Sequence, residues 1–117
     1  MAIKVQSLLE KIFPPKPHRR IFLEEYVNYK GKRLFFDFYI KEHSVYIECQ
    51  GAQHTKFVKH FHGTIENFRA QKFRDNLKIE YVQENNMSLV RVYDTEDITE
   101  ELLLFKINKA MECGFYE

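Results

Sequence analysis

The sequence predicts a single domain of the α/β (α+β) class, in which helices flank a mixed central sheet. The chain has 117 residues, which is the length of one domain and too short for two. Of these residues 44% are hydrophobic and 15% aromatic, which is enough to form one core. Three strand-like runs follow one another between residues 20 and 50, and apolar residues recur at helical spacing on both sides of them. We therefore expect residues 1–117 to fold as one unit.

The first half of the chain predicts a helix followed by a three-stranded meander. Apolar residues at helical spacing predict the helix over residues 2–12, and the Pro-Pro-Lys-Pro sequence after it ends it. Runs rich in Ile, Val, Phe and Tyr predict three strands, at residues 20–28, 33–40 and 45–50. A polar loop that contains three histidines follows, from Gly51 to about Thr64.

The second half predicts a long helix, a fourth strand and a last helix. The stretch over residues 65–84 contains no Gly or Pro, and four apolar side chains fall near one helical face: Phe68, Phe73, Leu77 and Tyr81. The fourth strand is expected at residues 88–93 and the last helix at residues 98–111. The predicted order of elements is αβββαβα.

The formal net charge of +1 conceals an uneven distribution of charge along the chain. Residues 1–78 hold fifteen Lys and Arg against eight Asp and Glu, whereas residues 79–117 hold three against nine. Such segregation indicates a polyanionic partner such as nucleic acid, although an uneven scatter of solvated charges gives the same count. The sequence shows no CxxC motif, no signal-like start and no apolar stretch long enough for a membrane span, so we expect a cytoplasmic protein without membrane contact.

Side-chain alternation separates polar from apolar residues in the second and third strands. One face of the second strand is expected to carry Phe36, Phe38 and Ile40. Asp37 lies on its other face. In the third strand Glu48 and Gln50 share a face, and Cys49 points to the opposite, apolar one.

Asp37 and Glu48 are expected to face each other in the sheet. If residues 41–44 form the hairpin loop, Ile40 pairs with Val45 and Asp37 opposes Glu48, with Cβ atoms about 4.5–5.5 Å apart. Like charges so close destabilise a sheet, and a divalent cation such as Mg²⁺ or Mn²⁺ would remove the repulsion. The alternatives are a one-residue slip in register or neutralisation of an exposed acidic face by neighbouring lysines.

These residues resemble the signature of the PD-(D/E)XK nuclease superfamily. The superfamily has an Asp near the end of the second strand and, about ten residues later, Glu-x-(Lys or Gln) on the third, which is similar to Phe36-Asp37 and Glu48-Cys49-Gln50. The similarity extends to very-short-patch-repair-like and homing endonucleases of phages and bacteria through Gln50-Gly51-Ala52-Gln53-His54 and Arg74-Asp75-Asn76-Leu77-Lys78. It covers roughly residues 20–95 and implies a restriction-endonuclease-like αβββαβ core, followed here by a C-terminal helix.

The resemblance implies a metal-dependent catalytic centre around the two acids. Asp37, Glu48 and the main-chain carbonyl of Cys49 would hold Mg²⁺ or Mn²⁺, the cofactor that the resemblance implies. Gln50 stands where the superfamily usually has Lys, and it can orient a water but cannot carry positive charge. Lys78, or alternatively its helix neighbour Lys72, would then supply the charge.

Two further positions match the resembling nucleases, and one does not. His54 would act as a general base or contact the scissile phosphate. Asp75 would stand beside the metal centre, or it pairs with a lysine on the helix surface. The acid that many relatives carry on the first helix has no clean match, since only Gln6 and Glu10 lie nearby, so a second metal ion is not assigned.

Basic and histidine side chains in the surrounding elements are expected to contact DNA. They are Arg19, Arg20, Lys32, Arg33, Lys56, Lys59, His62, Arg69, Lys72 and Arg74. A zinc site formed by the histidines with Cys49 is less favoured, because a second, paired thiol is lacking.

The function expected from these residues is that of a metal-dependent endodeoxyribonuclease that cuts duplex or branched DNA in a bacterial cell or a phage-infected host. The expected partner is DNA, with no small-molecule cofactor. Resolution of a junction would also require a homodimer. One alternative is a DNA-binding or assembly module of the same fold without efficient chemistry. Another is a protein-interaction domain that is indifferent to DNA.

Overall fold

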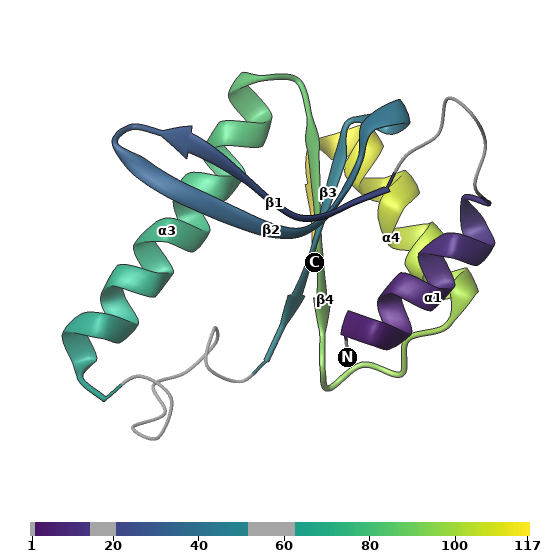
Figure 1. The fold of residues 1–117 in the computed structure, drawn as a ribbon, viewed down its shortest axis with the longest axis horizontal. Coiled ribbons are helices and arrows are strands. Elements are labelled where there is room, and N and C mark those ends of the chain that lie inside the picture. The colour runs from purple at the N-terminus through teal and green to yellow at the C-terminus, as the bar shows by residue number, and fades with distance from the viewer. Residues whose placement is uncertain (1, 15–20, 52–62) are drawn as a thin grey trace.

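The computed structural model describes residues 2–14, 21–51 and 63–117, and over these residues helices flank a five-stranded mixed sheet (Figure 1). The elements are α1 (Ala2–Ile12), β1 (Ile21–Tyr29), β2 (Lys32–Ile40), the 3-10 helix η1 (Lys41–His43), β3 (Val45–Gln50), α3 (Ile65–Glu84), β4 (Ser88–Tyr93), α4 (Glu100–Cys113) and β5 (Phe115–Tyr116). The predicted class and order are confirmed, and η1 and β5 are additions.

The sheet combines an antiparallel meander with a parallel half. Its strand order is β1-β2-β3-β4-β5, with antiparallel pairing from β1 to β3 and parallel pairing from β3 to β5. Parallel neighbours need a long crossover connection, and α3 lies within the segment that joins β3 to β4. The ends of β3 and β4 therefore lie side by side, close to the helix between them.

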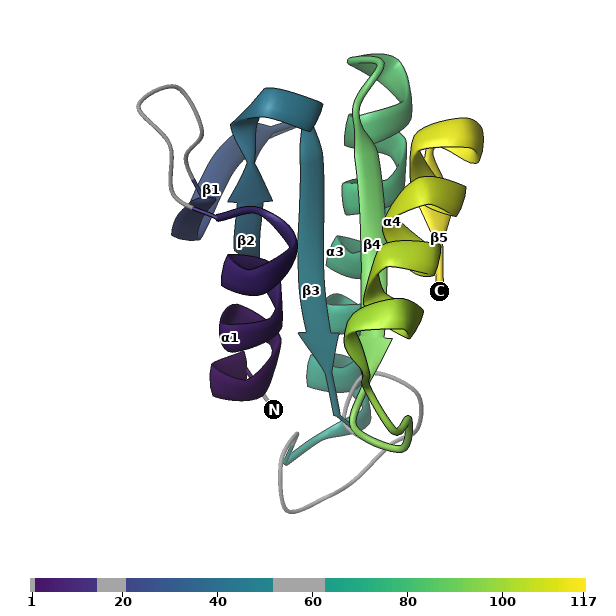
Figure 2. The same ribbon diagram turned by 90° about the vertical axis from the view of Figure 1, so that its right-hand side faces the viewer.

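Two apolar clusters hold the helices against the sheet. On one face α1 and α4 pack side by side (Figure 2), and fully buried side chains of both helices join one cluster, among them Val5, Leu9, Leu103 and Ile107. On the other face α3 packs with Leu77 and Val82 against the β1–β2 hairpin and β4. The central strands are covered on both sides, which is why polar side chains that lie between the layers need partners.

The register predicted for the second hairpin is confirmed. Ile40 pairs with Val45, and the β2–β3 ladder ends at Phe38 and Ile47. Beyond that point β2 pairs only with β1, and the two-stranded hairpin curves away from the sheet and crosses α3 (Figure 1). Glu24, at the position opposite Asp37, has a positive φ of 52°, where the ladder between the two strands is interrupted.

The curved hairpin changes the face on which one predicted core residue lies. Phe36 was expected to share a face with Phe38 and Ile40, and this is wrong. Phe38 and Ile40 pack with α1 and α4, whereas Phe36 packs on the α3 side, with its ring 4.1 Å from that of Tyr46. Two-stranded ribbons twist strongly, so side chains two residues apart on one strand can meet different layers.

The long helix is longer than the sheet that it covers. Its buried side chains, Asp75, Leu77 and Val82, all belong to its second half. Phe73 was expected on the buried face, which is wrong, because its side chain is 55% exposed. The first half of α3 projects past the edge of the sheet (Figure 1), so apolar side chains at helical spacing there have no core to pack against.

Local residues determine where the helices end. Thr64 and Thr99 cap α3 and α4, since each side chain accepts a hydrogen bond from a backbone N–H in the first turn, at 3.2 Å and 3.1 Å. The last helix therefore begins and ends two residues later than predicted. Gly114 follows it with a φ of +88°, a left-handed conformation that glycine adopts without strain. Over the described residues, no helix is both long and apolar enough to cross a membrane.

Candidate functional site

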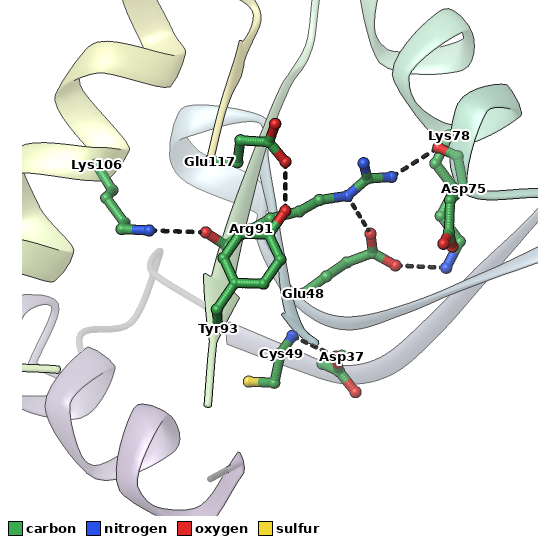
Figure 3. A network of polar contacts seen from close by, with 9 residues as sticks. All are labelled: Asp37, Glu48, Cys49, Asp75, Lys78, Arg91, Tyr93, Lys106 and Glu117. Atoms are coloured by element: carbon green, nitrogen blue, oxygen red, sulfur yellow. Dashed lines mark hydrogen bonds and ion pairs between the residues drawn. The ribbon is translucent and has the colours of Figure 1, made fainter. Parts of the chain in front are cut away.

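The site is centred on Glu48, a carboxylate that is buried between the sheet and α3. Its side chain is only 5% exposed. One oxygen forms an ion pair with the ammonium of Lys78, and the other lies 3.3 Å from Nε of Arg91 (Figure 3). A buried carboxylate is strongly destabilising without oppositely charged partners, and the fold supplies two.

Arg91 reaches Glu48 because β3 and β4 pair in parallel register. The two residues are direct partners across the ladder. The guanidinium is buried as well, and its Nη2 donates a hydrogen bond of 2.6 Å to the main-chain carbonyl of Asp75 on α3. Arg91 thus links β3, β4 and α3. Sequence reasoning missed it, although an arginine inside the apolar run Ser-Leu-Val-Arg-Val-Tyr is a signal, because a buried charge requires a partner.

Asp37 lies beside Glu48 but is held differently. Its Oδ2 accepts a hydrogen bond of 2.8 Å from the backbone N–H of Cys49, so it is attached to the neighbouring strand (Figure 3). Asp37 and Glu48 follow the last ladder pair and are not themselves paired. The repulsion between the two acids, which suggested a cation, is thus relieved by the protein itself, because Lys78 and Arg91 both pair with Glu48. This is close to the alternative in which lysines neutralise an exposed acidic face, except that Glu48 is buried.

A pocket of about 420 Å³ brings the predicted residues together. Its lining comes from β1, β2, β3 and α3: Glu24, Phe35, Phe36, Asp37, Glu48, Cys49, Gln50 and Lys78. The five members that the sequence assigned to the catalytic and metal sites, Asp37, Glu48, Cys49, Gln50 and Lys78, are therefore neighbours. Their chemical roles stay predictions.

Gln50 has a buried side-chain donor in this pocket that no described residue satisfies. The side chain is 3% exposed, and its Nε2 has no hydrogen-bond partner among the described residues. A buried amide N–H without an acceptor costs on the order of 1–3 kcal/mol, so this group favours an acceptor such as water or a bound molecule. Since Gln50 also lines the pocket, its amide can donate to an oxygen of a molecule bound there.

Asp75 is buried on α3, three residues before Lys78. Figure 3 shows both residues on the turn of α3 that faces Glu48. Asp75 is therefore not part of an exposed pair with a lysine on the helix surface, which was the alternative, because it is buried, at 3% exposure.

The acid that lies near both α1 and Asp37 is Glu24 of β1. Gln6 of α1 lines a smaller hollow of about 110 Å³ together with Asp37 and Glu24, whereas Glu10 accepts a hydrogen bond from Gln6. Glu24 lines both hollows, and sequence reasoning missed it. Counting across the Tyr29–Lys32 turn would have placed it opposite Asp37, since these strands pair position by position from that turn.

The donor atoms in the pocket are those that a hard divalent cation prefers. Asp37 and Glu48 offer carboxylate oxygens, which suits Mg²⁺ or Mn²⁺ better than a soft metal. Within the described ranges, no three or more His, Cys, Asp or Glu residues form a group that could hold a metal. Mg²⁺ commonly uses one or two carboxylates and completes its shell with water and phosphate, so two acids are compatible with it.

The predicted DNA-contacting residues that the structure describes fall in two places. Lys32 and Arg33 are exposed at the turn end of the β1–β2 hairpin. Arg69, Lys72 and Arg74 lie on the first half of α3, where Arg69 and Arg74 are exposed and Lys72 is partly buried. Arg74 is four residues before Lys78 and therefore shares its helical face.

Several predicted residues lie outside the described part of the chain. They are Arg19, Arg20, His54, Lys56, Lys59 and His62, together with His60 of the zinc alternative. Cys49, which would supply the thiol of the zinc site, packs its side chain against the core cluster of α1 and α4. Side-chain alternation along the third strand predicted this apolar position.

The Cys49 thiol is expected to react much more slowly than Cys113. Burial, followed by the negative charge of Asp37, raises the pKa of Cys49 to about 12, whereas Cys113 is exposed. The reactive form is the thiolate, so alkylation of folded Cys49 should become appreciable only as the pH approaches that value. At pH 8, iodoacetamide should label Cys113 in the native protein and both residues in urea, as peptide mass spectrometry can show. Equal labelling of both in the native protein would contradict the partly buried position of Cys49 and its raised pKa.

Comparison with known proteins finds one informative similarity. No protein-family model matches the chain. Over 83 residues it is 42% identical to a protein of Invertebrate iridescent virus 6 named "Uncharacterized protein 307L", a match that covers 70% of this chain and 40% of the viral protein. The matched chain thus spans less than half the length of that relative, whose name states no activity.

Proposed function

We propose that the protein is a metal-dependent endodeoxyribonuclease that hydrolyses phosphodiester bonds in DNA. The observation that carries the proposal is the shared pocket of Asp37, Glu48, Gln50 and Lys78, in which two carboxylates, an amide donor and an ammonium converge from three elements. Carboxylates that can hold a metal ion, with donors and a positive charge beside them, can supply the activated water and the charge neutralisation that phosphodiester hydrolysis needs, and the set agrees with the resemblance to PD-(D/E)XK nucleases.

Asp37 and Glu48 would hold the Mg²⁺ or Mn²⁺ ion. The metal, when bound, supplies a more acidic water and neutralises charge on the phosphate. Asp37 is oriented for this by the N–H of Cys49, which leaves its other oxygen directed away from that bond. Arg91 fixes the position of the Glu48 carboxylate from the side opposite Lys78.

Two other residues of the pocket, Lys78 and Gln50, would act on the phosphate. The Lys78 ammonium carries a positive charge beside the acids, at a point where a phosphate oxygen can share it with Glu48. Gln50 offers an Nε2–H group, which has no acceptor among the described residues, to a second phosphate oxygen or to the attacking water. Exposed Arg74, one helical turn before Lys78, and the hairpin residues Lys32 and Arg33 would contact neighbouring phosphates.

A second candidate is a DNA-binding module of the same fold that does not cleave. The observation in its favour is that both Glu48 oxygens already have cationic partners, so a metal ion has to compete with Lys78 and Arg91 for them. The two candidates share DNA binding and differ in chemistry, so one experiment separates them.

The test is incubation of the protein with supercoiled plasmid and with a synthetic four-way junction, in Mg²⁺, in Mn²⁺ and in EDTA. We expect nicked or linear product with either metal and none in EDTA. Salt-sensitive binding without cleavage in any metal would support the non-cleaving candidate instead. Cleavage that persists in EDTA, or the absence of both binding and cleavage, would contradict the proposal.

A further inference from the structure

An exposed aromatic pair lies on the β1–β2 hairpin next to the pocket. Tyr26 and Phe35 are direct partners across the two strands, and their ring centroids lie 5.7 Å apart at an angle of 44°. Their side chains are 49% and 55% exposed. The neighbours of Phe35 on β2, Leu34 and Phe36, are buried against α3, so the aromatic pair faces away from that helix.

A cation completes this surface. The guanidinium carbon of Arg33 lies 4.8 Å from the centre of the Tyr26 ring, and Arg33 is two residues from Phe35 on the same face of β2. We call Tyr26, Phe35 and Arg33 the hairpin platform. It combines flat apolar faces with a positive charge, which is the composition of surfaces on which nucleobases stack.

The platform is continuous with the candidate site. Phe35 lines the same pocket as Asp37, which is two residues further along β2, or about 7 Å at the rise of a strand. A nucleotide whose phosphate reaches Asp37 and Lys78 therefore has its base within reach of the Phe35 ring. Lys32 and Arg33 lie at the far end of the platform, where the next phosphates of a strand would pass.

We propose that the hairpin platform binds an unpaired nucleotide directly beside the phosphate that is cut, so that the substrate is DNA with unpaired bases at the cleavage position. The inference rests on the proposed nuclease function. In an uninterrupted duplex the base faces are covered by their neighbours, and contact with a duplex backbone requires cations but no exposed aromatic rings. A flap, a branch or a mismatched loop presents both a free base face and a phosphate.

The surface is less suited to a protein partner. A stable interface buries about 800 Å² on each side, whereas the hairpin platform consists of two rings and Arg33, with the charged Glu24 next to them. Charge also favours a nucleic acid. If the bases of a strand stack on the two rings, its phosphates would pass close to the cations Lys32 and Arg33.

The test compares binding of labelled DNA by fluorescence anisotropy in EDTA, which prevents cutting. The probes are a paired duplex, the same duplex with a single-stranded flap, and a single strand with 2-aminopurine in the sequence. We expect wild-type protein to bind flap and single strand at least ten-fold more tightly than the duplex and to quench 2-aminopurine. Phe35→Ala should lose about ten-fold in affinity for unpaired DNA and little for the duplex.

Phe73→Ala is the matched control, because Phe73 is also 55% exposed but lies on the projecting half of α3. It should bind all probes as wild type does, and Phe35→Trp should retain the preference for unpaired DNA. An unchanged preference in Phe35→Ala, in a variant with wild-type thermal midpoint, would overturn the platform but not the nuclease. A change of molecular mass in solution with Phe35→Ala would overturn it in favour of self-association. Failure of wild-type protein to bind any probe would overturn both proposals.

Discussion

Asp37→Asn is expected to reduce metal-dependent DNA cleavage about a thousand-fold, equivalent to roughly 4 kcal/mol of transition-state stabilisation, with little effect on folding. The loss follows because an amide oxygen is a much weaker ligand for a hard cation than a carboxylate. Folding should be preserved because Asn can still accept the hydrogen bond from the Cys49 N–H through its side-chain oxygen. Initial rates of plasmid nicking, measured with excess enzyme at several metal concentrations, determine the effect.

Asp37→Asn also distinguishes loss of chemistry from loss of structure. Asp97→Asn is the matched control, since that carboxylate is 95% exposed and only weakly paired with Lys4, at 4.0 Å. It should cleave at the wild-type rate. Binding of DNA in EDTA should be retained or strengthened in Asp37→Asn, because a negative charge is removed next to the phosphate path. Wild-type cleavage by Asp37→Asn would show that the site assignment is wrong.

Arg91→Leu should lower the free energy of unfolding by about 3–5 kcal/mol, because it removes one partner of a buried charge pair. Glu48 would keep only Lys78, and the carbonyl of Asp75 would lose the donor that it has now. Urea denaturation followed by circular dichroism measures the change. Arg69→Leu, which removes an exposed arginine from α3, should change stability by no more than about 0.5 kcal/mol.

The double variant Glu48→Gln/Arg91→Leu tests the cause of that loss. If the cost arises from an undercompensated carboxylate, neutralising Glu48 should recover part of the stability, so that the two changes are not additive. Strict additivity, or a loss below about 1 kcal/mol in Arg91→Leu alone, would contradict the importance of the buried pair.

The elements of the fold could be predicted because each has a local cause. A proline cluster ends α1, a four-residue connection sets the Ile40–Val45 pairing, and Glu48 and Gln50 follow from strand parity once that pairing is known. Lys78 was expected near the acids through the resemblance, and the structure places it on Glu48. Apart from the Lys78–Glu48 contact, which joins distant residues, these features depend on a few neighbouring residues, so the sequence expresses them directly.

The features that could not be predicted depend on how distant elements curve and extend. Phe36 changes faces because the hairpin leaves the sheet, and Phe73 is exposed because α3 extends beyond it. The two-residue strand β5 is too short to show alternation. The partnership of Glu48 with Arg91 requires the parallel register of β3 and β4, which is known only after α3 has been placed between them.

Charge counted along the sequence also differs from charge in space. The sequence divides into a basic part before residue 79 and an acidic part after it. In the fold, Lys30 of the hairpin turn forms an ion pair with Glu80 of α3, and the Tyr29 hydroxyl donates to Glu84 at 2.5 Å. Some of the late acids thus fasten the hairpin to α3, and the cations available to a polyanion are fewer than the count suggests.

The parallel pairing of β3 with β4 has a consequence for when the site comes into existence. The groups of the pocket are spread from residue 24 to residue 78, and the arginine that positions Glu48 follows at residue 91. During synthesis, β4 leaves the ribosome only after α3, so a growing chain lacks the residue that holds its central carboxylate in place. The site is therefore complete only once β4 has paired with β3 and brought Arg91 to Glu48.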